Sequence, residues 1–308
     1  MKKYVVIVLL CLVVASFVMC LRPKVHEYVI KDELKPQSMS ELASLSDAEL
    51  ERVDIGRMNL ICAMEASQAQ NFELNKWVKM LDAWAEHIKK AEQRFKPTFV
   101  RNPARYDNSY AKFKAVNLVL TLKEDFHCRY QMSLVQSGEL ENWNSPKFFK
   151  NPSDVFLLGL LDKRRGTCTS YAALIVAIGR RLGYPLYLKS TFGHLFCYWD
   201  DGVEHFNLDT NGEGVDTPLD ETYINGEHNR LKKLTKNDML RECVMKPLSN
   251  AESFSSFLEV AGYCLEANGK AFASQKVYRL ALKYRPGASN LKRLASRTIS
   301  LKFTGIQP

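Results

Sequence analysis

The stretch RRGTCTSYAALIVAIGRRLGYP, residues 164–185, decides how the rest of the chain is interpreted. After Cys168 the apolar residues recur at helical spacing, and Gly183 followed by Pro185 is a typical signal for the end of a helix. Cys168 therefore stands at the start of an amphipathic helix. Unpaired N–H groups and the positive end of the helix dipole favour a thiolate there, which would make this cysteine a nucleophile. The alternative is a small, buried, hydrophobic residue.

The segment after this helix changes to an alternating pattern rich in aromatic residues, which indicates β-strands. Three such runs follow one another, YPLYLKS at 184–190, GHLFCYWD at 193–200 and VEHFNLD at 203–209. The pair Asp201-Gly202 between the last two runs predicts a hairpin with a two-residue type I′ turn.

The predicted turn fixes the register of the hairpin. It places His194 directly opposite Asp209 on one face, with Cβ atoms about 4.5–5.5 Å apart. A carboxylate at that position would accept a hydrogen bond from one imidazole nitrogen and leave the other nitrogen free to act as a base.

The two faces of the hairpin indicate which cysteine His194 can activate. Cys197 lies an odd number of steps from His194 and points to that other face, which is otherwise apolar, so we expect it to be structural. Cys168 is then the candidate nucleophile, with His194 as base and Asp209 as the orienting acid. Helix N-terminal amides can help to hold an oxyanion, but the sequence assigns no side chain to that role.

Helical periodicity dominates the chain before the quoted stretch. Helices followed by antiparallel strands predict an α+β fold. The expected elements are a helix that begins with the capping box Ser46–Glu49 and continues, helices over 74–88 and 110–124, a loop at Pro97 and 102–103, and a helix that begins at Pro152.

The chain is helical again near its C-terminus, over residues 257–287. Gly262, Ser274 and Ala281 fall at the spacing of small residues in a tetratricopeptide helical hairpin. The segment is either part of a peptide-binding repeat array or a helical hairpin packed on the main domain.

Composition places few limits on function. The chain has 308 residues, 46% of them hydrophobic, which is enough for one large domain or two small ones. Its formal charge of +9 favours an anionic environment. Lys and Arg form no dense run interleaved with aromatic residues, which argues against nucleic-acid binding. The eight cysteines include no CxxC pair, and we find neither metal-ligand spacing nor a phosphate loop, so no metal or cofactor is expected.

Residues 4–21 form an uncharged apolar run flanked by basic residues. As a helix these eighteen residues would span roughly 27 Å, close to the ~30 Å of a bilayer core. The run is a signal anchor, a signal peptide cleaved after Ser16, or a lipoprotein signal ending at Cys20. Each alternative places the rest of the protein outside the cytoplasm, in the periplasm or at the cell surface, after a linker over 22–37.

The segments GTCTSYAALIVAIGRRLGYP and GHLFCYWDDGVEHFNLDTN resemble the transglutaminase-like superfamily of papain-type cysteine enzymes. In that family a Gly-x-Cys opens a helix, a His opens a strand, and an Asp ends the next strand. The resemblance implies that Cys168 is the nucleophile, His194 the base and Asp209 the orienting residue. The stretch 151–196 also looks like a bacterial branch that joins this core to tetratricopeptide repeats.

The likeness covers most of residues 45–285 and implies a domain organisation. It predicts a transglutaminase-like domain with a helical N-terminal part at 38–235 and a tetratricopeptide-like helical region at 250–308. The implied activity is cleavage or transfer of amide acyl groups on proteins or peptides through a thioester. The alternative is a non-catalytic peptide-binding scaffold whose C-terminal helices dock a protein partner. Residues 210–218, TNGEGVDTP, are expected to form a loop beside the site.

Overall fold

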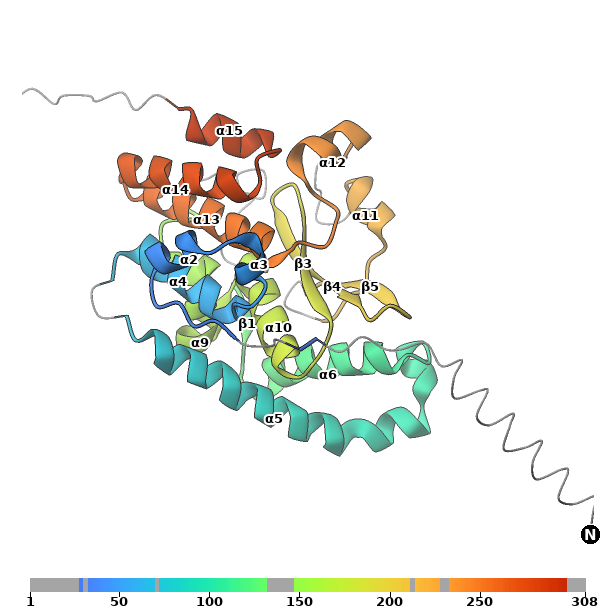
Figure 1. Cartoon of the computed structure of the whole chain (residues 1–308). Helices are drawn as coiled ribbons and strands as arrows, with labels where there is room; N and C mark the ends of the chain where they lie inside the picture. The colour runs from blue at the N-terminus through green and yellow to red at the C-terminus, as the bar shows by residue number, and fades with distance from the viewer. Residues whose placement is uncertain are drawn as a thin grey trace, which may run out of the picture.

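The computed structural model describes residues 28–29, 33–69, 72–131, 147–210, 214–227 and 233–297. Within these ranges the protein has the α+β fold expected from the sequence (Figure 1). Helices surround a small antiparallel sheet of three strands, and a second, parallel pair of two-residue strands lies at the start of the central helix.

The central helix is α10, which begins at Cys168 and ends at Arg181 as the sequence predicts. Most of its residues are buried, because helices pack on one side of it and the sheet packs on the other. Gly179 allows the close approach of the sheet, since a Cβ atom at this position would lie 2.3 Å from Leu186 Cδ1. The buried helix therefore fixes the position of its own N-terminal residue, Cys168.

The sheet has the order β3-β4-β5, with β3 at Leu186–Thr191, β4 at His194–Asp200 and β5 at His205–Leu208. The predicted two-residue turn is wrong, because residues 201–204 form the connection between β4 and β5. The Asp201 carboxylate accepts hydrogen bonds from the backbone N–H groups of Val203 and Glu204 and from the Trp199 indole, which stabilises this longer loop.

The longer loop shifts the register of the hairpin by two residues. Cys197 pairs with Leu208, so the position opposite Asp209 belongs to Phe196 rather than to His194. Side chains alternate with a period of two along a strand, so a shift of two residues leaves His194 and Asp209 on the same face.

The N-terminal helices differ from the expected ones at two points. The capping box of Ser46 and Glu49 is present, but α3 (Asp47–Leu50) ends early and α4 (Ile55–Ser67) starts anew. The break has a physical reason, since Asp54 both caps α4 and forms a buried ion pair with Arg181 at 2.7 Å. The predicted loop at Pro97 is wrong as well, because α5 extends over Leu74–Arg101. Its last turns are held by the ring of Phe99, which packs against three aromatic residues, Tyr106, Tyr110 and Phe113.

The helix that begins at Pro152 is divided in two at Phe156. The Asn59 side chain accepts a hydrogen bond from the Leu157 N–H at 3.0 Å, where the second part begins. The other elements are α2 (Met39–Ser44), η1 (Pro103–Tyr106), α6 (Tyr110–Glu124), β1 (Arg129–Tyr130), α8 (Pro152–Val155), α9 (Leu157–Lys163), β2 (Arg165–Gly166), α11 (Asp220–Ile224) and α12 (Lys236–Glu242).

The C-terminal helices are α13 (Asn250–Ala267), α14 (Ala271–Tyr284) and α15 (Ser289–Ala295). The first two pack closely, because Gly262 leaves space for the ring of Tyr278. Asn250 joins α13 to the body, since it donates to the Leu50 carbonyl at 3.1 Å and accepts from Arg180 at 2.6 Å. The hairpin is thus packed on the main body, which is one of the two alternatives left open by the sequence.

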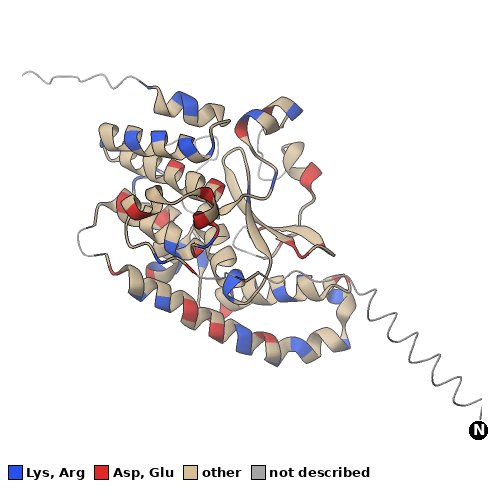
Figure 2. Ribbon diagram, viewed as in Figure 1, with Lys and Arg blue, Asp and Glu red and all other residues tan. Residues whose placement is uncertain are grey.

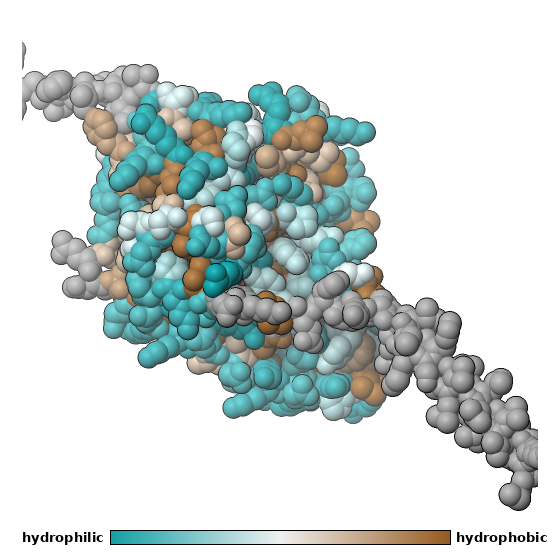
Figure 3. All heavy atoms as spheres, in the orientation of Figure 1, coloured by the Kyte–Doolittle hydropathy of each residue, from teal (hydrophilic) through white to brown (hydrophobic). Residues whose placement is uncertain are grey.

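Several sequence predictions concern residues outside the described ranges, including the apolar run at 4–21. In the ranges that the structure does describe, no helix is both long enough and apolar enough to cross a bilayer. The six cysteines in these ranges are free thiols, and no group of three His, Cys, Asp or Glu side chains is placed to hold a metal. Hydrophilic residues cover most of the face seen in Figure 3, as expected when the apolar residues form a core.

Candidate active site

The candidate nucleophile, Cys168, is the first residue of α10 and is partly buried. Thr167, just before it, donates its N–H to the Ser170 hydroxyl at 2.8 Å, which fixes the first turn. Gly166 is required by close packing there, since a Cβ atom would lie 2.3 Å from Ser170 Oγ. The thiol consequently lies at a rigid helix N-terminus, where the helix dipole favours its anion.

The structure brings His194 and Asp209 together despite the shifted register. Nε2 of His194 lies 2.6 Å from Oδ2 of Asp209, and both side chains are buried. Asp209 follows β5 and is held there by two backbone hydrogen bonds to Asp216, each 2.9 Å long. The predicted loop over 210–218 therefore returns to pair with the end of the strand, although its residues 211–213 lie outside the described ranges.

The third predicted residue joins the other two through its sulfur. The side chains of Cys168 and His194 are hydrogen bonded, and the Leu195 backbone N–H also donates to the sulfur. Because Nε2 of His194 faces Asp209, the Nδ1 atom is the one available to the thiol. All three residues selected from the sequence thus form one hydrogen-bonded series.

The electrostatics of this series favour a thiolate–imidazolium pair. Burial disfavours the imidazolium, but the Asp209 carboxylate outweighs burial and raises the pKa of His194 to about 10. Burial also disfavours the thiolate, yet the hydrogen bond and positive charge of His194 outweigh it and lower the pKa of Cys168. The sulfur is therefore expected to be ionised and the imidazole protonated near neutral pH.

Tyr130 is a site residue that the sequence analysis missed. Its hydroxyl accepts a hydrogen bond from the Cys168 N–H at 3.1 Å and also contacts the Cys168 sulfur. Burial, then the charge of Cys168, raise the pKa of Tyr130 well above its ordinary value, so the hydroxyl keeps its proton. The hydroxyl therefore lies beside the sulfur with a proton to donate, and it is a candidate for the oxyanion donor that the sequence does not assign.

Tyr223 is a second residue that was missed, and it positions Asp209. It donates its hydroxyl hydrogen to Asp209 Oδ2 at 2.8 Å, while the Thr210 N–H donates to Oδ1 at 2.7 Å. The Tyr223 ring stacks on Phe196 with centroids 4.1 Å apart, on the side of the sheet that carries His194. The carboxylate is consequently held by groups that leave little freedom for rotation.

Cys197 has the structural position that its strand parity predicts. It is buried, and its thiol donates to the Ala172 carbonyl of α10 at 3.4 Å. Burial, the largest influence, raises the pKa of Cys197 well above that of an ordinary thiol. This cysteine is therefore unsuited to act as a nucleophile.

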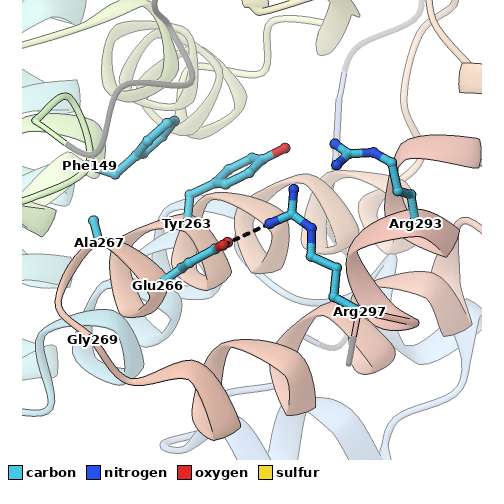
Figure 4. A pocket seen from close by; sticks show the side chains of 7 residues that line it. All are labelled: Phe149, Tyr263, Glu266, Ala267, Gly269, Arg293 and Arg297. Carbon is cyan, nitrogen blue, oxygen red and sulfur yellow. Dashed lines mark hydrogen bonds and ion pairs between the residues drawn. The ribbon is translucent and has the colours of Figure 1, made fainter. Parts of the chain in front are cut away.

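The cleft beside Cys168 is narrow. Residues of α10, β4 and the end of β5 line it, and they leave no space for a water molecule. A larger cavity lies elsewhere, among the C-terminal helices, and is lined by none of Cys168, His194 and Asp209 (Figure 4). A substrate would therefore have to widen the cleft in order to reach the sulfur.

The chain matches no protein-family model, no curated protein and no solved structure. The assignment of a function consequently depends on the geometry of the site itself.

Proposed function

We propose that the protein is a cysteine enzyme with a papain/transglutaminase-like core that cleaves or transfers amide acyl groups on proteins or peptides. The observation that supports this most strongly is the series Cys168–His194–Asp209, with the thiol at the N-terminus of a buried helix and the 2.6 Å bond between His194 and Asp209. A thiol that is merely buried has a raised pKa, as Cys197 does, whereas the contact with His194 lowers the pKa of Cys168.

In the proposed reaction the Cys168 thiolate attacks the carbonyl carbon of an amide. The Tyr130 hydroxyl, which itself accepts from the Cys168 N–H, donates its hydrogen to the negative oxygen and stabilises it. The imidazolium of His194 donates its proton to the leaving nitrogen, the C–N bond breaks, and an amine departs from the thioester.

The second half of the reaction regenerates the thiolate. Neutral His194 accepts a proton from water or from a second amine, which attacks the thioester carbonyl. The S–C bond breaks, the acid or the new amide departs, and the thiolate–imidazolium pair forms again. Asp209 keeps the imidazole oriented in both halves. We favour hydrolysis, since we identify no side chains that would hold an acceptor amine against abundant water.

A pooled library of glutamine-containing peptides, with and without an added lysine-like amine, tests this proposal. Mass spectrometry separates cleavage, deamidation and cross-linked adducts. Cys168→Ala is expected to abolish every product, whereas Cys197→Ala, which changes a buried thiol on the other face of the hairpin, should retain them. Products that persist in Cys168→Ala would contradict the proposed nucleophile.

The alternative function is a non-catalytic peptide-binding scaffold. It is favoured by the narrow cleft at Cys168 and by the larger cavity among the C-terminal helices. The same library distinguishes the two functions, because a scaffold would give no product and would leave the reactivity of Cys168 ordinary.

We also propose that residues 4–21 attach the protein to a membrane or direct its export, with the folded domain outside the cytoplasm. The expected result is recovery of full-length protein in the membrane or extracytoplasmic fraction, with the domain accessible to protease added from outside. Recovery as soluble cytoplasmic protein would exclude the anchor, the signal peptide and the lipoprotein signal together.

A further inference from the structure

We infer that the groove between α13 and α15 binds an acidic peptide segment of a partner protein. A carboxylate of the peptide pairs with Arg293, and a neighbouring apolar side chain packs at Phe149 and Tyr263. The inference assigns a partner class to the docking surface of the scaffold alternative. It does not depend on the chemistry at Cys168.

The groove contains a cavity of about 510 Å³, which is within the usual size range of ligand sites. Three separate parts of the chain meet there, namely α13 with the turn after it, α15 with Arg297 two residues beyond its end, and the segment before α8 (Figure 4). The lining residues are Phe149, Tyr263, Glu266, Ala267, Gly269, Arg293 and Arg297.

One wall of the cavity is apolar and already ordered. The ring of Phe149 stacks on that of Tyr263 with centroids 4.9 Å apart, and Tyr263 meets Tyr278 edge-on at 5.7 Å. At Gly269 the space that a side chain would fill is open, since a Cβ atom would meet nothing within 4 Å. An apolar side chain of a ligand can therefore enter without rearrangement of these rings.

The other wall carries a positive charge that has no anionic partner among the described residues. Glu266 accepts from the Tyr278 hydroxyl at 2.9 Å and pairs with Arg297 at 2.7 Å, which offsets both charges. Arg293 donates to the neutral amide of Asn290 at 2.7 Å, and within the described ranges no carboxylate forms an ion pair with it. Figure 4 shows the guanidinium groups of both arginines directed toward the space beside Tyr263.

The surface of the C-terminal helices around the cavity is also positively charged. Residues 250–297 contain eight Lys and Arg against three Glu, a net charge of +5. The ribbon of α14 and α15 is coloured blue at several basic positions in Figure 2. Each of the three glutamates has a cationic partner, at distances from 2.5 to 3.8 Å. The region consequently attracts an acidic partner, and a guanidinium is the group best shaped to bind a carboxylate with two hydrogen bonds.

A peptide suits the groove better than a small molecule does. Sites for small ligands bury about 70–90% of the ligand, whereas Arg293 and Arg297 are both exposed at the rim of this cavity. An extended peptide can place one side chain in the cavity while its backbone and the paired carboxylate remain at the surface.

The test is fluorescence anisotropy with full-length protein in mild detergent and the fluorescein-labelled hexapeptide Glu-Asp-Phe-Glu-Asp-Glu. Arg293→Gln is expected to weaken binding at least tenfold. Glu266→Gln keeps an acceptor for Tyr278 but removes a negative charge, so it should strengthen binding several-fold. Lys276→Gln, which removes an exposed charge on α14 outside the cavity, should change the affinity less than twofold.

Two comparison peptides complete the design, one with Ser in place of Phe and one with amides in place of the acids. Both should bind at least tenfold more weakly than the probe. Equal losses for Arg293→Gln and Lys276→Gln would show non-specific attraction to a basic surface and would overturn the inference, as would equal affinity for the Ser peptide or no binding. Cys168→Ala should bind the probe like the wild type, which separates this result from the proposed catalysis.

Discussion

Asp209→Asn is the substitution that most directly perturbs the proposed catalytic pair. The side chain keeps its size and can still accept from the Thr210 N–H, but the negative charge 2.6 Å from the imidazole is lost. The pKa of His194, raised from 6.5 to about 10, corresponds to roughly 5 kcal/mol in favour of the imidazolium at 1.36 kcal/mol for each pKa unit. Burial, which lowers this pKa, is then opposed only by the hydrogen bond and the charge of Cys168.

Loss of the charge on His194 also changes the pKa of the Cys168 thiol. A buried, uncharged imidazole no longer stabilises the thiolate, so the pKa of the thiol rises to or above the ordinary value of about 8.5. At pH 6 a thiol of that pKa is only about 0.3% ionised. We therefore expect alkylation of Cys168 by iodoacetamide at pH 6 to slow at least 100-fold in Asp209→Asn.

The assay is the rate of Cys168 alkylation, followed by peptide mass spectrometry between pH 5 and 9. Asp216→Asn is the matched control, since Asp216 is exposed and its contact with Asp209 uses only backbone atoms. The control should react like the wild type. If Asp209→Asn also keeps the wild-type rate and pH profile, then Asp209 is only a strand-end residue and the reasoning about the pair is refuted.

Three further substitutions test the groups around the pair. Tyr130→Phe removes the donor beside the Cys168 N–H, so turnover of an amide substrate should fall about 10²-fold, as for other oxyanion-hole donors, while the alkylation rate of Cys168 changes less than fivefold. Tyr223→Phe keeps the ring that stacks on Phe196 but removes one hydrogen bond to Asp209, and turnover should fall about threefold to tenfold with an unchanged melting temperature. Gly166→Ala places a methyl group 2.3 Å from Ser170 Oγ and should destabilise the fold by about 1–3 kcal/mol in urea unfolding, whereas Gly214→Ala, with nothing within 4 Å, should have little effect. An unchanged turnover rate in Tyr130→Phe would contradict the first expectation, and loss of the fold in Tyr223→Phe would contradict the second. An unchanged urea midpoint in Gly166→Ala would contradict the third.

Local patterns predicted the central helix and the α+β class because they depend on neighbouring residues. The end signal at Gly183, the apolar stripe of α10 and the alternation of the strands each report on a single element. The face shared by His194 and Asp209 was also predictable, although the turn was wrong, because parity is unaffected by a shift of two residues.

The remaining features depend on contacts between distant segments. Tyr130 lies 38 residues before Cys168, in a strand of two residues that has no periodic signal of its own. Tyr223 reaches Asp209 from a short helix, and the loop at 201–204 depends on which groups the Asp201 carboxylate accepts from. Local rules predict that Pro97 ends the helix, because the aromatic residues that hold the end of α5 come later in the chain.

The central claim is that Cys168 is ionised by a protonated His194, and the pH dependence of its alkylation in the wild-type protein tests it most directly. Access to the narrow cleft scales the rate equally at each pH, so the ratio of the rates at pH 8 and pH 6 reports ionisation alone. For an ordinary thiol with a pKa of about 8.5 this ratio is roughly 75. Because His194 lowers the pKa of the Cys168 thiol, we predict a ratio well below 75 for Cys168. A ratio near 75 for Cys168 would show an ordinary thiol and would contradict the account.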